Sequence, residues 1–195
     1  MRKFTISAYA ALACLLCFSV GAGADVVVAN PSFEEPVVTG SEAKVFVHDE
    51  KGLKWTVYNT VQVINYCNAP DGKQALMIDA EYDPCSNAYQ MIRTPVGKRY
   101  KISFQLAPCQ DKPSNLDLMW GLGGQTGTLK VVATLKPEKY TGGGWQKLPW
   151  KKCEYITEVV PKDQPPFNVI TFQARRGNCP IVDAVTVEEY KEPAN

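Results

Sequence analysis

The sequence predicts an all-β protein, a two-sheet antiparallel β-sandwich of the jelly-roll type. Residues 100–106 alternate strictly between apolar and polar side chains, as expected for a half-buried antiparallel strand. Short segments of this kind recur along the chain, separated by clusters of turn-forming residues. No window of helical length shows an apolar stripe with a period of 3.6 residues. Many short strands with frequent turns indicate a sandwich or barrel, and we favour the sandwich.

The predicted strands follow one another to the end of the chain. Alternation is clearest in residues 100–106 and 129–135. Shorter apolar runs predict further strands at residues 26–28, 55–58, 61–65, 74–79, 88–92, 116–120, 154–160, 167–174 and 177–188. We expect one domain over residues 25–190, followed by a short polar tail at residues 191–195.

The first residues predict a signal peptide over residues 1–24. Arg2 and Lys3 precede an apolar run to Val20, and Ala22 and Ala24 give the small-x-small pattern of a signal-peptidase site. The run is short for a membrane anchor, and no later segment is apolar enough to span a bilayer. We therefore expect a secreted, extracellular protein.

The charge balance favours an uncharged partner. The 195 residues carry a formal net charge of +1 at pH 7, and removal of the predicted signal leaves the chain near neutral. Neither a nucleic acid nor an anionic membrane is expected as a partner.

The cysteine content is consistent with an oxidising compartment. Of the seven cysteines, two lie in the predicted signal, which leaves Cys67, Cys85, Cys109, Cys153 and Cys179. Secretion makes disulfides the default expectation, although five is an odd number and the counting alone leaves the pairing open. Without a CxxC pair, and with one histidine in the chain, a zinc site is disfavoured.

The last predicted strand places a carboxylate among apolar neighbours. Strand alternation puts Ile181, Asp183, Val185 and Val187 on one face. A buried carboxylate needs hydrogen-bond donors, a basic partner or a metal ion. The best candidate partner is residues 30–35, so we expect the two ends of the mature chain to meet there.

Five stretches resemble galactose-binding-like jelly rolls, which include the carbohydrate-binding modules of xylanases and glucanases. They are residues 30–34 (NPSFE), 54–57 (KWTV), 70–76 (PDGKQAL), 97–104 (GKRYKISF) and 181–187 (IVDAVTV). The chain also resembles a plant cell-wall protein family of unknown function built from tandem domains of this kind, through Trp145, Trp150, Cys109 and residues 179–183. It departs from these patterns at Lys54, where glycine is usual, at Ala184, where a second acid is common, and in having one domain.

The resemblance implies a structural calcium ion held by Glu34 and Asp183. Calcium accepts six to eight oxygen ligands in flexible geometry, so a site joining the two ends is chemically reasonable. The alternative is that both acids cap turns or pair with Arg175, Arg176 or Lys44.

The resemblance also implies a disulfide between Cys109 and Cys179, because the strands that carry them are expected to be antiparallel neighbours. Cys67 and Cys85 would then close a loop over a binding edge, with Cys153 left over.

Sugar binding combines aromatic faces that stack on pyranose rings with polar side chains that bond hydroxyls. Among the aromatic residues of the chain, Tyr66 and Tyr89 are the better candidates for the surface. Trp145 is expected to pack over the end of the sandwich rather than to contact a ligand. The predicted ligand-binding residues are Tyr66, Asn87, Tyr89, Gln90, Trp145 and Trp150.

The leading hypothesis is a secreted, non-catalytic module that binds a polysaccharide or oligosaccharide of a cell wall or extracellular matrix. A protein-interaction module that binds a secreted wall-modifying enzyme is the second hypothesis. The third is a polysaccharide hydrolase or lyase using Asp79, Glu81 and Arg93, since such chemistry needs only two carboxylates or a base and an arginine. His48 has no recognisable catalytic partner in the sequence, so no enzyme is expected.

Overall fold

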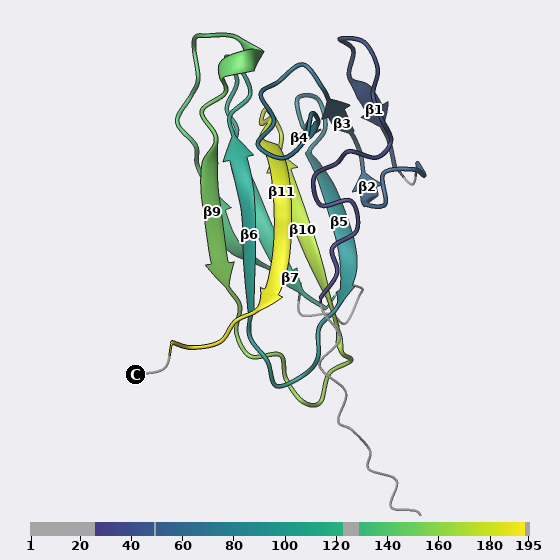
Figure 1. Cartoon of the computed structure of the whole chain (residues 1–195), viewed down its shortest axis with the longest axis vertical. Helices are drawn as coiled ribbons and strands as arrows, with labels where there is room; N and C mark the ends of the chain where they lie inside the picture. The colour runs from purple at the N-terminus through teal and green to yellow at the C-terminus, as the bar shows by residue number, and fades with distance from the viewer. Residues whose placement is uncertain (1–25, 49, 123–128, 194–195) are drawn as a thin grey trace, which may run out of the picture.

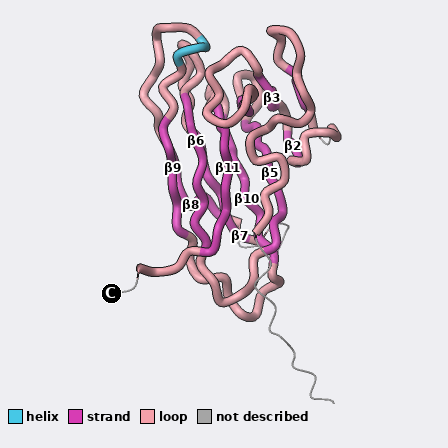
Figure 2. Tube along the Cα trace, in the orientation of Figure 1, coloured by secondary structure: helices cyan, strands magenta, loops and turns pink. Residues whose placement is uncertain are grey.

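The computed structural model describes residues 26–48, 50–122 and 129–193. These residues form two antiparallel sheets packed face to face, with one short 3-10 helix, η1 (Trp145–Lys147), at one end (Figures 1 and 2). The strands are β1 (Lys44–Phe46), β2 (Thr56–Tyr58), β3 (Val61–Ile64), β4 (Ala75–Ile78), β5 (Cys85–Arg93), β6 (Tyr100–Ala107), β7 (Leu116–Gly121), β8 (Lys130–Leu135), β9 (Lys151–Ile156), β10 (Phe167–Arg175) and β11 (Ile181–Glu189). The predicted all-β, two-sheet sandwich is confirmed.

The last strand lies in the middle of the larger sheet. The six-stranded sheet has the order β1-β3-β4-β11-β6-β9, and the five-stranded sheet has the order β2-β5-β10-β7-β8. Within the described ranges, no helix is long and apolar enough to cross a membrane.

The main core fills the space between the two sheets because alternate residues of each strand point into it. In β10, Ile170, Phe172 and Ala174 are buried in this core, so the residues between them point to the outside of the five-stranded sheet. The rings of Phe104 and Phe172 meet edge to face across the core, with centroids 4.9 Å apart.

A second apolar cluster lies on the opposite side of the six-stranded sheet. In β4, Leu76 and Ile78 face the main core, whereas Ala75 and Met77 belong to this second cluster. Leu148, next to η1, is buried with them. Loops therefore cover this outer side, and it is not an open sheet surface.

A β-bulge in β11 changes which residues share a face. The register of β11 on β6 shifts between Asp183 and Thr186, and Ala184 has a φ of 52°. Ile181 therefore belongs to the outer cluster, while Val185 and Val187 face the main core. The predicted common face for Ile181, Asp183, Val185 and Val187 is wrong because the bulge adds one residue to the strand.

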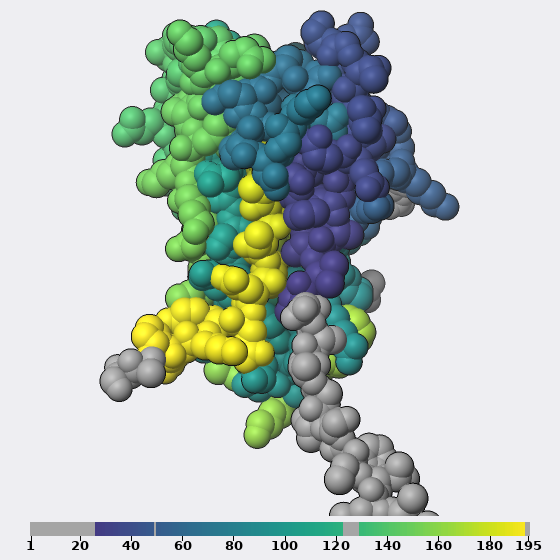
Figure 3. All heavy atoms as spheres, viewed as in Figure 1, coloured from purple at the N-terminus to yellow at the C-terminus, as the bar shows by residue number. Residues whose placement is uncertain are grey.

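The two ends of the domain meet at this bulge. The backbone N–H of Val185 donates to the carbonyl of Pro31 at 2.9 Å. The N-terminal segment lies beside β11 on the molecular surface (Figure 3). The expectation that residues 30–35 pack against the last strand is confirmed, whereas the prediction that they supply the partner of Asp183 is wrong, because its donors are the N–H groups of Asp71 and Ala184.

Some strand boundaries differ from the predicted ones. Residues 26–28 form no strand, β1 was not predicted, and the strand expected at residues 154–160 runs from Lys151 to Ile156. The strand observed there, β9, lies at the edge of its sheet, so its charged side chains conceal the apolar alternation. The predicted signal peptide and the final two residues of the predicted tail lie outside the described residues.

Gly72 should be far less tolerant of a side chain than Gly40, although both have a positive φ (86° and 82°). A Cβ atom at Gly72 would collide with the carboxylate of Glu34, whereas a Cβ at Gly40 meets nothing within 4 Å. We expect Gly40→Ala to cost about 1 kcal/mol of unfolding free energy for backbone strain. Gly72→Ala should cost about 1 to 3 kcal/mol more, because Glu34 must release the amide groups of Lys73 and Gln74.

Urea denaturation of the two variants measures this difference. Equal losses for Gly72→Ala and Gly40→Ala would show that the contact with Glu34 contributes nothing.

Candidate functional site

The outward side chains of the five-stranded sheet form ordered rows across the strands. The register places Tyr58 of β2 opposite Asn87 of β5, which in turn lies opposite Gln173 of β10. Gln173 is paired with Asp117 of β7, and Asp117 with Thr134 of β8. This polar row crosses the whole sheet.

The next row is mixed in character. Tyr89 lies opposite Thr56 and Thr171, and Thr171 is paired with Met119, which lies opposite Val131. Tyr58 of β2 and Tyr89 of β5 are therefore diagonal neighbours on this face. The two rows together give a face with aromatic, hydroxyl and amide groups.

A hollow of about 300 Å³ lies over these rows. The residues that line it are Tyr58, Asn87, Tyr89, Met119, Leu129, Val169, Thr171 and Gln173. Tyr58 is 45% exposed, and its ring meets that of His48 edge to face at 5.3 Å. An exposed tyrosine held by a neighbouring ring provides a defined surface for stacking.

Thr171 is an unusual residue at the base of this hollow. Its side chain is 3% exposed, and its Oγ1 has no hydrogen-bond partner among the described residues. A buried hydroxyl without a partner costs about 1 to 3 kcal/mol. Thr171 therefore keeps an unused donor and acceptor just beneath the surface of the hollow that the residue lines.

The side-chain amides of Asn87 and Gln173, which line the hollow, are also unused. Within the described ranges neither side chain makes a hydrogen bond. Most other side-chain amides bond to backbone or side-chain groups, for example those of Asn30, Asn59, Gln62, Asn65, Asn68, Gln74, Gln90 and Asn168. Two amides are thus available at the hollow for a ligand.

A second, polar hollow of about 230 Å³ adjoins the first and shares Gln173 with it. Asp117 accepts hydrogen bonds there from Arg175 Nε at 2.8 Å and from Thr134 Oγ1 at 2.6 Å. The Asp117 carboxylate raises the pKa of the Arg175 guanidinium. The charges at this end of the face therefore cancel.

Two of the predicted ligand-binding residues, Asn87 and Tyr89, lie together at the first hollow. Gln90 is on the same strand but points to the other side. Its amide donates to the carbonyls of Ala29 and Lys54, and its Oε1 accepts from the N–H of Ala29. Gln90 thus anchors the N-terminal segment.

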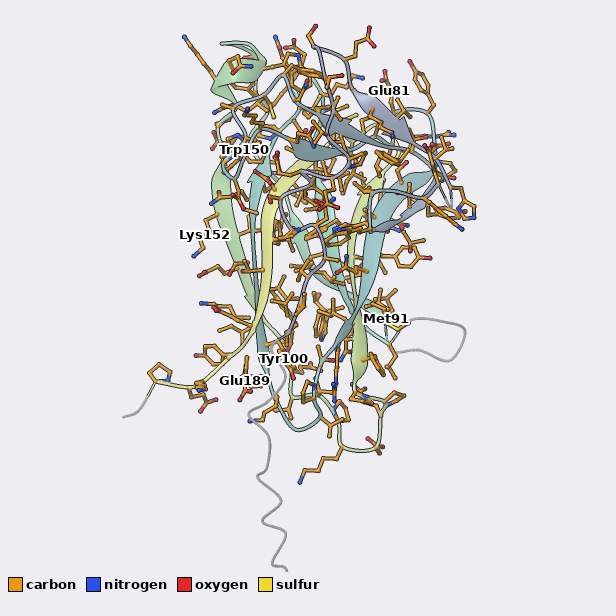
Figure 4. All side chains as sticks on the ribbon, turned by 45° about the vertical axis from the view of Figure 1, so that its right-hand side comes forward. Glu81, Met91, Tyr100, Trp150, Lys152 and Glu189 are labelled. Carbon is orange, nitrogen blue, oxygen red and sulfur yellow. The ribbon has the colours of Figure 1, made fainter. Side chains whose placement is uncertain are left out.

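The other three predicted residues lie together in a different place, on the outer cluster of the six-stranded sheet. The rings of Tyr66 and Trp145 meet edge to face at 5.0 Å, and Trp150 packs against the same cluster (Figure 4). Burial raises the pKa of Tyr66. Trp150 Nε1 is buried without a partner among the described residues.

Tyr66, Trp145 and Trp150 thus help to cover the six-stranded sheet, whereas Asn87 and Tyr89 lie on the five-stranded sheet. The sequence analysis did not identify Thr171 or Gln173. The sequence did contain a pattern that could have identified them, because the odd-numbered positions of residues 167–174 are the ones that do not face the core.

The predicted metal ligands Glu34 and Asp183 hold the same loop, residues 71–74. Asp183 accepts the N–H groups of Asp71 at 2.9 Å and Ala184 at 2.7 Å. Glu34 accepts the N–H groups of Lys73 at 2.8 Å and Gln74 at 2.7 Å. Each carboxylate is therefore satisfied by backbone donors.

The pKa of Asp183 is raised to about 7, mainly by burial; the amide hydrogen bonds from Asp71 and Ala184 oppose this rise, and the negative charges of Asp71 and Glu34 add to it. Two acids close to one another suit a divalent cation, although the described residues contain no group of three or more His, Cys, Asp or Glu that could hold a metal. Calcium at Glu34 and Asp183 stays a prediction.

All five described cysteines are free thiols in the structure, which therefore holds neither predicted disulfide. Cys85 begins a strand of the five-stranded sheet, whereas Cys67 is buried in the outer cluster of the other sheet, so the two are in different layers. Cys109 and Cys179 do lie side by side, because the β6–β11 register continues to them. The thiol of Cys179 lowers the pKa of Cys109 through a hydrogen bond.

No protein-family model matches the chain, and no curated protein matches it. Its fold does resemble solved structures. A cyclase from Fischerella sp. TAU is 13% identical with a TM-score of 0.60, over 88% of this chain and 99% of the cyclase. The CBM22-1 xylan-binding domain of Paenibacillus barcinonensis Xyn10C is 16% identical with a TM-score of 0.51, over 80% of this chain and 99% of that domain.

The CBM22-1 and GH10 modules of Clostridium thermocellum xylanase 10B, complexed with xylohexaose, are 15% identical with a TM-score of 0.51. That match covers 73% of this chain and 27% of the xylanase chain. The chain has the galactose-binding-like jelly-roll fold. At these identities the likeness concerns the fold, and the function has to be argued from the outer face itself.

Substitution of Gln90 should lower the free energy of unfolding more than substitution of Asn87, although the two residues are only three positions apart on β5. Gln90→Ala leaves the N–H and C=O of Ala29 without side-chain partners and should cost about 1 to 3 kcal/mol of unfolding free energy. Asn87→Ala removes no hydrogen bond and should change it by less than about 0.5 kcal/mol. Urea denaturation measures both, and a large loss for Asn87→Ala would contradict the free state of its amide.

Proposed function

We propose that the protein is a secreted, non-catalytic module that binds an uncharged polysaccharide of a cell wall or extracellular matrix on the outer face of its five-stranded sheet. The observation that carries the proposal is the buried Thr171 hydroxyl without a partner, at the base of a hollow rimmed by tyrosines. The solved sandwiches of similar fold include xylan-binding domains, which supports the same ligand class.

The chemistry of the hollow suits a sugar. Tyr58 and Tyr89 offer aromatic faces for the C–H side of a pyranose ring. Asn87, Gln173 and Thr171 supply donors and acceptors for its hydroxyls. Asp117 and Arg175 neutralise each other, so the polar end of the face offers no uncompensated charge to an anionic or cationic polymer.

The arrangement of the acids supports a binding role. Among the described residues that line the two hollows, Asp117 is the single acid, and glycoside hydrolysis ordinarily uses two. Asp79 and Glu81 are occupied elsewhere. Asp79 accepts from Gln62 Nε2 at 2.7 Å, and Glu81 pairs with Lys112 (Figure 4).

A second candidate function is the binding of a secreted protein such as a wall-modifying enzyme. The observation that favours it is the exposure of Met91 and Phe167, which are 67% and 42% exposed on the same face. Capture of a defined secreted hydrolase by the immobilised module, without any retention of polysaccharide, would support this function over sugar binding.

Binding should depend on Tyr89 and not on Tyr66. We expect affinity electrophoresis against pectins, xylans and β-glucans to show retardation by one polymer, without shortening of that polymer. Tyr89→Ala should reduce the affinity at least tenfold because a stacking surface is lost. The matched variant Tyr66→Ala removes a tyrosine from the outer cluster and should keep the affinity. Retardation that depends on Tyr66 would move the site to that cluster.

Thr171→Val should separate binding from stability. Valine has nearly the same shape and removes the unpaired hydroxyl, so the free energy of unfolding should stay equal or rise by about 1 kcal/mol. Affinity for the retained polysaccharide should fall about threefold to tenfold, for the loss of one hydrogen bond. Thr171→Ser keeps the hydroxyl and serves as the control in calorimetric titration. Full affinity in the valine variant would remove Thr171 from the site.

Secretion is part of the proposal and implies a disulfide between Cys109 and Cys179. A small-molecule disulfide such as oxidised glutathione would accept the two electrons and two protons that the thiols lose. We expect peptide mapping of the secreted protein to find this link, with Cys85 and Cys153 free. A Cys67–Cys85 link would contradict it.

Calcium held by Glu34 and Asp183 also belongs to the proposal. Adding a chelator to the purified protein should lower its Tm, and Glu34→Gln should abolish that response.

A further inference from the structure

Exposed apolar side chains gather on the outer face of the five-stranded sheet. Tyr58, Met91, Val131 and Phe167 are 45%, 67%, 40% and 42% exposed. The register places Met91 opposite Val169, and Val131 opposite Met119, so these side chains share the face that carries Thr171. Figure 4 shows Met91 projecting from the sheet away from the core.

The apolar and polar groups are separated along the strands. Asn87 and Gln173 lie at one side of Tyr89 and Thr171, and Met91 and Val169 lie at the other. Two strand residues span about 6.6 Å, so a sugar ring over Thr171 would have amides beyond one edge and apolar groups beyond the other. Phe167 extends the apolar side by one further step on β10.

Met91 and Phe167 contribute little to the fold because most of Met91 and nearly half of Phe167 remain in contact with solvent. Single exposed apolar residues are common on proteins and need no explanation. Here, however, they adjoin a hollow whose base holds an unpartnered buried hydroxyl, Thr171 Oγ1.

The size of the apolar area favours a small apolar group over a protein partner. It consists of the exposed Met91 and Phe167 and of Val169, which is 6% exposed, with Arg93 opposite Phe167 at its end. A stable protein interface needs about 20 to 30 residues from each side. An alkyl, acyl or aryl group attached to a sugar needs only a few such contacts.

We propose that the ligand is amphipathic: a glycan or glycoside whose sugar lies over Asn87, Thr171 and Gln173 and whose apolar substituent lies over Met91, Val169 and Phe167. This inference rests on the proposed sugar-binding function and names the class of ligand. The substituent is an alkyl, acyl or aryl group carried by the sugar adjacent to the bound ring.

The test compares matched glycosides by calorimetric titration. Methyl and hexyl β-D-xylopyranosides, with the corresponding galactosides and glucosides, are titrated below their micelle concentrations, with 1-hexanol as a sugar-free control. For the sugar that binds, the hexyl glycoside should bind at least tenfold more tightly than the methyl glycoside, because each buried CH₂ group contributes about a fourfold gain. 1-Hexanol should bind more weakly than the hexyl glycoside by at least tenfold.

Variants locate the apolar contact. Met91→Gln keeps the side-chain length and should remove most of the hexyl advantage while leaving the methyl glycoside unchanged. Val45→Thr changes another exposed apolar side chain, on β1 of the other sheet, and should change neither. Loss of the advantage in both variants would show a non-specific effect and overturn the inference.

The remaining outcomes separate the two claims. Equal affinity for the methyl and hexyl glycosides, in a protein that is retarded by a polysaccharide, would overturn the amphipathic ligand and leave sugar binding intact. Hexanol binding as tightly as the hexyl glycoside would also overturn it, since the sugar would contribute nothing. A protein that binds neither polysaccharide nor any glycoside would overturn the proposed function and this inference together.

Discussion

The burial of Asp183 in the central strand of the larger sheet is the constraint on which the rest of the structure depends. Its carboxylate is fully buried, so it must receive donors from the protein. The N–H groups of Asp71 and Ala184 provide them. Ala184 can do so because the bulge turns its backbone. The same bulge brings the N–H of Val185 to Pro31 and closes the sandwich.

The outer side of the five-stranded sheet takes no part in this contact between the two ends of the domain. On β5, Gln90 is inward and fully bonded, while Asn87 and Tyr89, which precede it in the strand, face a hollow and keep their polar groups unused. The inward side chains of β5 therefore support the fold, and its outward side chains provide groups that can bind a ligand. The rigidity of the sheet holds the outward groups in fixed register, so a ligand would meet an ordered array.

The sequence was sufficient for the fold because the apolar alternation of segments such as residues 100–106 survives in the structure as β6. It was insufficient for the bulge, since nothing local distinguishes Ala184 from its neighbours in a strand. Aromatic content alone could not distinguish Tyr89, within β5, from Tyr66, which follows β3, because a tyrosine in or beside a strand can lie on a surface or in a packed cluster. Tertiary packing decides that Tyr66 meets Trp145 and that Tyr89 stands beside Thr171.

The cysteines illustrate the same limit. Cys109 and Cys179 are adjacent because of strand register, which the family resemblance carried, whereas Cys67 and Cys85 were paired by elimination and occupy different layers. Local sequence contains no information on which sheet a strand joins.

The contact between Pro31 and Val185 also sets an order of events during synthesis. The segment around Pro31 packs on β11, which is synthesised after all the other described strands and lies between β4 and β6. The larger sheet therefore cannot be completed until β11 has been synthesised. Until then the apolar side chains of the earlier strands stay uncovered, which lengthens the period in which the chain can associate wrongly.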